Sequence, residues 1–306
     1  MSEAAVRTFA GADPRWPALP VAAWQDTRDT LHLWTQVVGK TKLALAPPLN
    51  HWWGVTLHLG ATGLTTGLMP TADGGLEVAF DLCAHELRLT TTDGRARVLR
   101  LEPRSVADLW AEYRAHLDDL GVRVHLDPVP VELAEVVPFA EDTRHASYDA
   151  AAVTAFWRSL VSSATVMARF RGEFRGKASP VHFFWGAFDL AVTRFSGRSA
   201  PRHPGGVPNC PDRVMHEAYD AELSSAGYWP GGAEEGAFYS YAYPEPTGFR
   251  ERVLATPGAA FDTGLGEFLL PYRTVREAAD PEATLLAFLR ETAAAAADLA
   301  SWPRTA

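Results

Sequence analysis

The chain has 306 residues, of which 47% are hydrophobic and 11% aromatic, so it can bury a large core in one domain or in two of roughly 150 residues. Its formal net charge of -9 is spread along the chain, which argues against nucleic acid as the main partner. We expect a soluble, cytoplasmic protein without a membrane partner, because no run approaches the roughly 18 apolar residues of a membrane span and residues 1–20 lack a secretion signal.

The first half is predicted to contain a long helix followed by an antiparallel meander. Apolar side chains recur at helical spacing from Trp24 to Leu45 and stop before Pro47, which predicts an amphipathic helix lying on a sheet. Short β segments separated by glycine-containing turns are predicted at residues 51–59, 64–69, 76–81, 86–91 and 97–101. Ser105 is expected to cap a helix that ends near Leu120, and another strand is predicted over residues 122–126.

The second half again begins with a long helix. A helix is predicted from Tyr148 to Arg171, and a buried strand from Ser179 to Ser196. A Pro/Gly-rich loop of the length that often covers a site then spans residues 200–212. The remaining elements are predicted as a helix at 214–226, a strand at 238–243 and a terminal helix that begins at Asp280-Pro281.

These elements predict an α+β fold in which mostly antiparallel sheets are flanked by long amphipathic helices. The polar stretch 141–145 is the best candidate boundary, giving halves at 1–145 and 146–306, with one compact domain as the alternative. In each half a long helix precedes a similar motif, His51-Trp-Trp-Gly in the first and His182-Phe-Phe-Trp-Gly in the second. The halves are therefore candidates for two diverged copies of one unit.

Several specific motifs occur in order along the chain. They are His51-Trp-Trp, Ser179-Pro-Val-His-Phe-Phe-Trp-Gly with Phe188-Asp-Leu-Ala and Thr193-Arg-Phe-Ser-Gly-Arg, Ser224-Ser-Ala-Gly-Tyr-Trp-Pro-Gly, and Ala237-Phe-Tyr-Ser-Tyr-Ala-Tyr-Pro-Glu-Pro. Over essentially the whole chain the sequence resembles DUF5996, a bacterial family of unknown function. The resemblance implies no activity, substrate or cofactor.

The segment from Ser179 to Ser196 holds the main candidates for catalysis, because ionisable groups in a buried strand are either satisfied or functional. In a straight strand His182 shares a face with Arg194, whereas Asp189 points to the other face. Seven extended residues also separate His182 from Asp189 by about 23 Å. The two can form a dyad only if the chain turns or bulges at Gly186. The alternative is that each is hydrogen-bonded separately.

A second polar cluster lies on the helix predicted at 214–226. Glu217 is its best functional candidate, because the turn that follows would bring its end of the helix toward an aromatic surface. Glu222 lies roughly 140° away around the helix axis, so the two carboxylates cannot form a pair without another element. His216 and Asp220 share a side and could bind a metal, but no third ligand and no HExxH motif are found.

Aromatic residues supply the third signal. Alternation puts Tyr239, Tyr241 and Tyr243 on one face of a strand, which suits either a ligand pocket or core packing against a helix. An arginine that follows the histidine could bind a carboxylate or phosphate. The full set of candidate binding residues is Arg194, His51, Trp52, Trp53, Trp185, Trp229, Tyr239, Tyr241, Tyr243 and Glu222.

Three functions fit these residues. The first is an enzyme that acts on a small organic, perhaps anionic, molecule in an aromatic-lined pocket by acid–base chemistry of His182, Asp189 and Glu217. The second is a non-catalytic protein that binds or senses a small molecule in the same pocket. The third is a metal-dependent enzyme, which would need His182 close to His51 or to a glutamate. The sequence determines neither the substrate, nor any cofactor, nor the oligomeric state.

Overall fold

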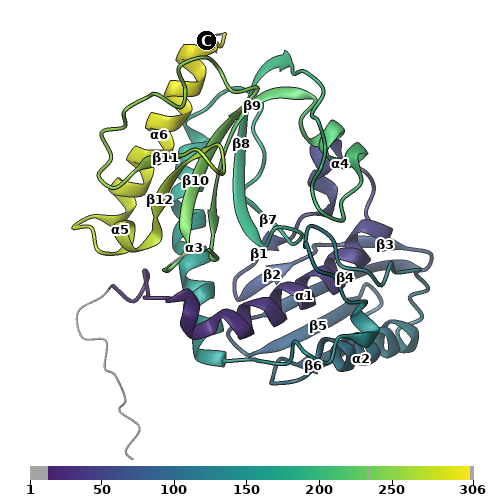
Figure 1. Ribbon diagram of the computed structural model, residues 1–306. Coiled ribbons are helices and arrows are strands. Elements are labelled where there is room, and N and C mark those ends of the chain that lie inside the picture. The colour runs from purple at the N-terminus through teal and green to yellow at the C-terminus, as the bar shows by residue number, and fades with distance from the viewer. Residues whose placement is uncertain (1–12, 233, 304–306) are drawn as a thin grey trace, which may run out of the picture.

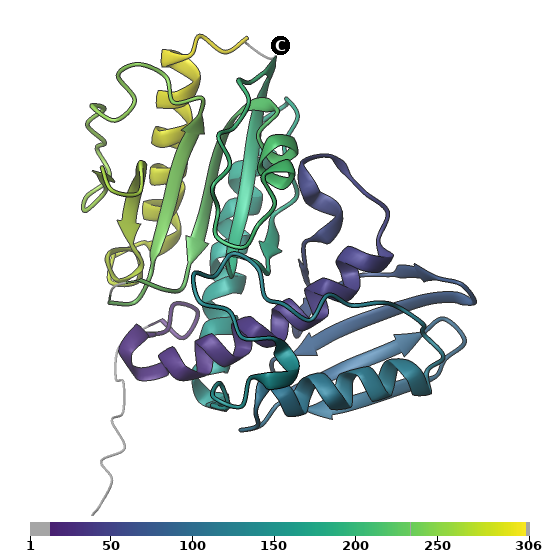
Figure 2. The ribbon, with the colours of Figure 1, turned by 45° about the vertical axis from the view of Figure 1, so that its right-hand side comes forward.

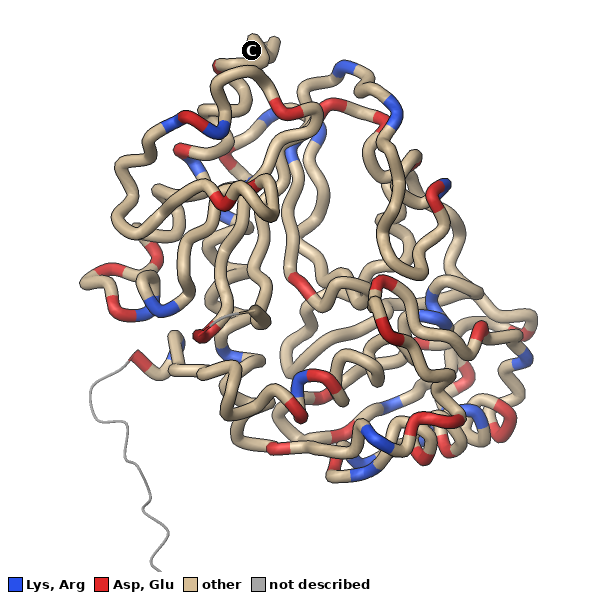
Figure 3. The backbone as a smooth tube through the Cα atoms, viewed as in Figure 1, with Lys and Arg blue, Asp and Glu red and all other residues tan. Residues whose placement is uncertain are grey.

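The computed structural model describes residues 13–232 and 234–303, which form two antiparallel six-stranded sheets with helices packed against them (Figure 1). The predicted α+β fold is confirmed. No helix in the described part of the chain is both long and apolar enough to span a membrane. Lys, Arg, Asp and Glu are scattered over the molecule and do not gather in one large patch (Figure 3).

The first half follows the predicted order of helix, meander and helix. Its sheet has the strand order β1-β2-β4-β5-β6, with β3 paired to β4. The elements are α1 (Val21–Leu45), the 3-10 helix η1 (Asn50–Val55), β1 (His58–Leu59), β2 (Gly63–Thr65), β3 (Met69–Thr71), β4 (Gly74–Asp81), β5 (Glu86–Thr91), β6 (Ala96–Arg100), α2 (Val106–Asp119) and the 3-10 helix η2 (Phe139–Glu141).

The second half has the strand order β11-β12-β10-β9-β8-β7. The elements are α3 (Ala150–Gly172), β7 (His182–Phe184), β8 (Asp189–Ser199), α4 (Asp212–Ala218), β9 (Ala221–Trp229), β10 (Ala237–Tyr243), β11 (Ala260–Asp262), β12 (Glu267–Pro271), α5 (Tyr272–Arg276) and α6 (Pro281–Leu299). The strands β11 and β12 and the helix α5 are absent from the sequence-based prediction.

The long helices begin and end where local chemistry predicts. Ser105 accepts a hydrogen bond from the backbone N–H of Asp108 and so caps α2, and Asp280 caps α6 in the same way. Asp149 accepts two such bonds at the start of α3. Each cap satisfies N–H groups that the first turn of a helix leaves unpaired, which explains why these boundaries are visible in the sequence.

Each sheet buries one face beneath helices (Figures 1 and 2). In the first sheet Leu76, Val78 and Phe80 are buried, whereas Glu77 between them is exposed. In the second sheet α3 and α6 cover the face that carries Leu190 and Phe238. The opposite face of the second sheet carries the tyrosines and Asp189, and it is the face that concerns function.

The two sheets meet at their first strands. The backbone N–H of Leu57 donates to the carbonyl oxygen of Phe183 at 2.9 Å, and the reverse bond is 2.8 Å. The ring of Trp185 packs against Gly39 of α1 so closely that a Cβ on Gly39 would lie 2.2 Å from it. One hydrophobic cluster therefore contains side chains of both halves.

Three local predictions are wrong. Residues 51–55 belong to η1, with His51 and Trp52 in the left-handed region at φ 55° and 60°. Residues 122–126 form no strand: Gly121 ends α2 with φ 72°, and the segment has no sheet neighbour. The predicted helix at 214–226 ends at Ala218, because the segment from Ala221 pairs with both β8 and β10 and is held as a central strand.

Candidate functional site

The chain reverses direction at residues 185–188, so the predicted straight strand is a hairpin of β7 and β8. The turn brings Gly186 next to Glu132, because a Cβ on Gly186 would lie 2.1 Å from a carboxylate oxygen of that flexible side chain. The carbonyl oxygen of Gly186 is 2.8 Å from Nε2 of His32. Phe188 adopts φ 59°, and its ring is buried and stacked on Phe156.

The turn changes which side chains share a face. Phe184 pairs with Asp189 and His182 pairs with Ala191, so His182 and Asp189 point to the same side of the sheet. Arg194, an odd number of residues from Asp189 along β8, points to the opposite side. The prediction from a straight strand is therefore wrong in both respects.

His182 and Asp189 nevertheless have separate hydrogen-bond partners. Nδ1 of His182 is 3.0 Å from the hydroxyl of Thr56, and that hydroxyl donates to the carbonyl oxygen of Trp53, so Nδ1 carries the imidazole proton. Burial, together with the nearby charges of His58 and Lys42, lowers the pKa of His182 to about 3. His182 is therefore a neutral, fully buried side chain.

Asp189 accepts a hydrogen bond from the hydroxyl of Tyr239, which reaches it from β10 across the intervening strand β9. The reach is possible because Gly227 lies between them: a Cβ there would be 2.3 Å from the Tyr239 ring. Burial raises the pKa of Asp189 to about 6, although the bond from Tyr239 opposes this change. Asp189 is buried and Tyr239 is half-buried, and both lie on the sheet face opposite α3 and α6.

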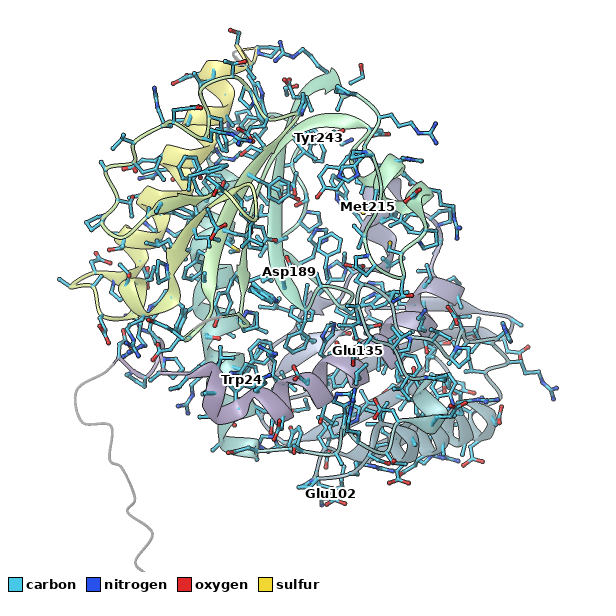
Figure 4. All side chains as sticks on the ribbon, in the orientation of Figure 1. Trp24, Glu102, Glu135, Asp189, Met215 and Tyr243 are labelled. Atoms are coloured by element: carbon cyan, nitrogen blue, oxygen red, sulfur yellow. The ribbon has the colours of Figure 1, made fainter. Side chains whose placement is uncertain are left out.

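Further tyrosines extend this group. The hydroxyls of Tyr241 and Tyr219 are 2.8 Å apart, and the hydroxyl of Tyr243 donates to the carbonyl oxygen of Pro201 at 3.0 Å. The ring of His203 packs against Tyr219 and Tyr243. We call the four tyrosines 219, 239, 241 and 243, together with Asp189, the tyrosine face. Asp189 and Tyr243 lie across from Met215 of α4 in Figure 4.

Two more carboxyl groups belong to this region. Burial and the charge of Asp189 raise the pKa of Glu132 to about 7. Burial and the charges of Asp189 and Asp262 raise the pKa of Glu267 to about 7. No basic side chain among the described residues counteracts either change or that of Asp189. Ionisation of Asp189 therefore opposes ionisation of Glu132 and of Glu267.

Four residues of this region were not predicted from the sequence: Glu132, Glu267, Tyr219 and His203. Glu267 could not be placed because β12 was not predicted. Since β10 and β12 are antiparallel and Ser240 pairs with Phe268, Glu267 lies opposite Tyr241. The other three come from loops or from the end of α4. The only available signal was the Pro/Gly-rich loop at 200–212, whose residues Pro201 and His203 do contact the tyrosines.

His51 and Trp53 form a second group with Lys177 and Phe195. The imidazole of His51 stacks on Phe195 at 4.5 Å, and its Nε2 is 2.6 Å from Nζ of Lys177. Its Nδ1 is 3.3 Å from a carboxylate oxygen of Asp220. Burial, and then the Lys177 charge, lowers the pKa of His51, which favours a neutral ring that accepts a hydrogen bond from the lysine.

The other candidates lie outside both groups. Arg194 sits over the ring of Phe170 at 3.4 Å and donates to the carbonyl oxygen of that residue at the end of α3. Glu222 is paired with Arg198 at 2.7 Å. Glu217 is exposed on α4, and Trp52 is half-buried in η1. The indole N–H of Trp185 donates to the carbonyl oxygen of Val55. Trp229 is 41% exposed at the end of β9.

No group of three or more His, Cys, Asp or Glu side chains within residues 13–232 and 234–303 is arranged to hold a metal ion. A metal site would require His182 close to His51, but the contact that the two share is through Trp53, whose ring is 5.2 Å from His51 and 6.4 Å from His182. Glu217 and Glu222, predicted on one helix, lie on α4 and β9.

Comparison with known proteins gives one match. The sequence model of DUF5996, a family of unknown function, matches residues 16–306. The chain belongs to DUF5996. The match spans both sheets and every residue of the tyrosine face, and it confirms the resemblance carried by the sequence motifs. No curated protein and no solved structure matches the chain.

Proposed function

We propose that the tyrosine face binds a small organic molecule that carries a positively charged amino group. The observation that carries this proposal is the buried carboxyl group of Asp189, which accepts a hydrogen bond from Tyr239. Its charge raises the pKa values of Glu132 and Glu267, and no basic side chain within residues 13–232 and 234–303 counteracts these changes. Ionised groups in such a setting are costly unless they are paired. A bound ammonium group would supply the missing charge.

The aromatic rings favour the same kind of ligand. Tyr219, Tyr239, Tyr241 and Tyr243 are all half-buried, so part of each ring remains accessible. A cation over the face of a tyrosine ring is stabilised by about 0.5–2 kcal/mol, more when water is excluded. An anionic ligand is disfavoured here, because Arg194 lies on the helix-covered side of the sheet.

An acid–base enzyme at the same place is a second candidate. A carboxyl group with a pKa of about 6 is ionised in part near neutral pH and can both take up and release a proton. The hydrogen bond from Tyr239 would orient it. The geometry supports Asp189 in this role better than His182, which is fully buried and neutral, or Glu217, which is exposed on α4.

The proposal is tested by isothermal titration calorimetry at about pH 8 with benzylamine, benzyl alcohol and benzoate, which share a ring and differ in charge. We expect benzylamine to bind, and Asp189→Asn to weaken it at least tenfold, since a hydrogen bond to a charged group contributes about 1.5–3 kcal/mol. Glu102→Gln removes one exposed carboxylate far from Asp189 in Figure 4 and should leave binding unchanged. Preferential binding of benzoate would refute the proposal.

Binding and catalysis are separated by native mass spectrometry of freshly purified protein. A co-purifying amine would be identified and then incubated with excess protein. If its mass changes, and Asp189→Asn stops the change, the enzyme hypothesis holds. If the amine is recovered intact, the face only binds it.

A further inference from the structure

A second concave site lies apart from the tyrosine face. A cavity of about 200 Å³ opens between α1 and the chain segment that precedes α3. This is smaller than the roughly 300–1,000 Å³ of typical pockets for drug-sized ligands, so it admits only a small molecule. Neither Asp189 nor any of the four tyrosines lines the cavity.

One wall of the cavity is a pair formed by the buried carboxylate of Asp142 and the partly buried imidazole of His145. Asp142 is 2% exposed, and one of its oxygens accepts hydrogen bonds from the backbone N–H groups of Arg144 and His145, both at 3.1 Å. The other oxygen is 2.6 Å from Nδ1 of His145. This contact places a proton on Nδ1 and fixes the ring, so Nε2 is the nitrogen left for a ligand.

The position of this pair is held by the rest of the fold. The backbone N–H of Val106 donates to the carbonyl oxygen of His145, and that of Ala107 donates to the carbonyl oxygen of Asp142, both at 3.0 Å. The cavity wall is therefore tied to the first turn of α2. A site held in this way is preorganised and loses little entropy when a ligand binds.

Two charges of opposite sign line the cavity without a charged partner in the described part of the chain. They are the carboxylate of Glu135, labelled beside α1 in Figure 4, and the guanidinium of Arg144. Asp29, which also lines the cavity, is paired with Arg28 at 2.7 Å. Side chains of Leu33, Leu133 and Val137 supply an apolar part of the wall.

We propose that this cavity binds a free α-amino acid with an apolar side chain. Arg144 holds its carboxylate, Glu135 and Nε2 of His145 accept hydrogen bonds from its ammonium group, and Leu33, Leu133 and Val137 contact its side chain. Arginine is suited to a carboxylate because its planar fork can donate two parallel hydrogen bonds. The cavity is small and, among the residues that the structure describes, carries one unpaired charge of each sign, so it fits a zwitterion better than a simple acid or a simple amine. This inference does not depend on the function of the tyrosine face.

The test is calorimetry at about pH 7.5 on the Asp189→Asn variant, in which the tyrosine face should bind amines only weakly. The ligands are L-leucine, 4-methylpentanoate, which lacks the ammonium group, and 3-methylbutylamine, which lacks the carboxylate. We expect leucine to bind with a Kd of about 1 mM or tighter, and each analogue to bind at least tenfold more weakly. Absence of leucine binding up to about 20 mM, or equal binding of either analogue, would overturn the proposal.

Two variants assign the contacts. Arg144→Gln and Glu135→Gln should each weaken leucine binding at least tenfold, and both should fold because the two side chains are exposed. Circular dichroism checks the fold. Glu102→Gln, made in the same Asp189→Asn background as the two cavity variants, is the control that should leave leucine binding unchanged. If neither cavity variant affects leucine, the amino acid binds elsewhere and the assignment is wrong.

Discussion

Asp189 is the residue at which the chemistry of the second sheet converges. Its carboxyl group would be expensive to ionise in isolation, and the hydroxyl of Tyr239 offsets part of that cost. Removing the hydroxyl should therefore make the carboxyl group harder to ionise. The pH at which the proposed amine site becomes ionised should therefore be set in part by the hydrogen bond from Tyr239 to Asp189.

We predict that benzylamine affinity rises as pH increases through about 6 and that Tyr239→Phe moves this midpoint to higher pH. Tyr243→Phe is the matched control, because its hydroxyl donates to Pro201 and not to Asp189. Calorimetry between about pH 5 and 8 measures both midpoints. An unchanged midpoint in Tyr239→Phe would show that the bond does not control ionisation of the site.

Glu132 carries a related cost for stability. Its pKa is raised from 4.5 to about 7, so the folded state binds more protons than the unfolded state between these values. The stability associated with the protonated group is fully present below about pH 4.5 and is lost as pH rises through about 7. Ionisation of Glu132 therefore lowers the free energy of unfolding at neutral and alkaline pH.

We predict that the denaturant midpoint of the native protein falls between about pH 5 and 8, and that Glu132→Gln makes this fall smaller. Denaturation followed by circular dichroism at both pH values tests this. Glu102→Gln, which removes an exposed carboxylate, should leave the fall unchanged. A fall of the same size in Glu132→Gln would contradict the role given to this group.

At the scale of elements, α1 sets the position of the β7–β8 hairpin. The ring of Trp185 lies on Gly39 of α1, and its indole N–H donates to the carbonyl oxygen of Val55 at 2.7 Å. His32, about two turns before Gly39 on α1, contacts the carbonyl oxygen of Gly186. A glycine inside a helix is normally unfavourable, so Gly39 is explained by this close approach.

Gly39→Ala should consequently destabilise the protein. The gain in helix propensity is about 1 kcal/mol, whereas overpacking a well-filled core costs about 1–3 kcal/mol, and the ring at 2.2 Å leaves no space for a methyl group. Chemical denaturation should show a lower midpoint. Gly172→Ala at the end of α3, where no atom lies within 4 Å of the added Cβ, should cause no loss. Equal effects of the two substitutions would argue against the Trp185 contact.

At the scale of the whole molecule, the two halves share one core. The first strands of both sheets pair at Leu57 and Phe183, and Trp185 of the second half packs on α1 of the first. Separation of the halves would expose these contacts together. The proposed duplication of one α+β unit stays a prediction, although a long helix precedes a six-stranded sheet in each half.

We predict that the full chain unfolds in one transition in which far-ultraviolet circular dichroism and tryptophan fluorescence coincide. The reason is that loss of either half removes apolar contacts from the other. Equilibrium denaturation with both probes tests this. Two separated transitions would show that the halves are independent folding units.

Local chemistry was visible in the sequence. Ser105 and Asp280 predicted the starts of two helices, apolar spacing predicted α1 and α3, and the alternation of Tyr239, Tyr241 and Tyr243 predicted one shared face. Each of these features depends on residues within one or two turns of each other. The motifs also identified the family over nearly the whole chain.

Contacts between residues far apart in the chain determined the features that the sequence did not predict. The segment from Ala221 became β9 because it has partners on both sides, against a local pattern that favours a helix. The turn at Gly186 reversed the sides expected for Asp189 and Arg194. Glu132 and Glu267 reach the tyrosine face from distant segments, and their pKa values depend on burial and on Asp189. Burial and electrostatic coupling are properties of neighbours in space, so no local pattern in the chain encodes them.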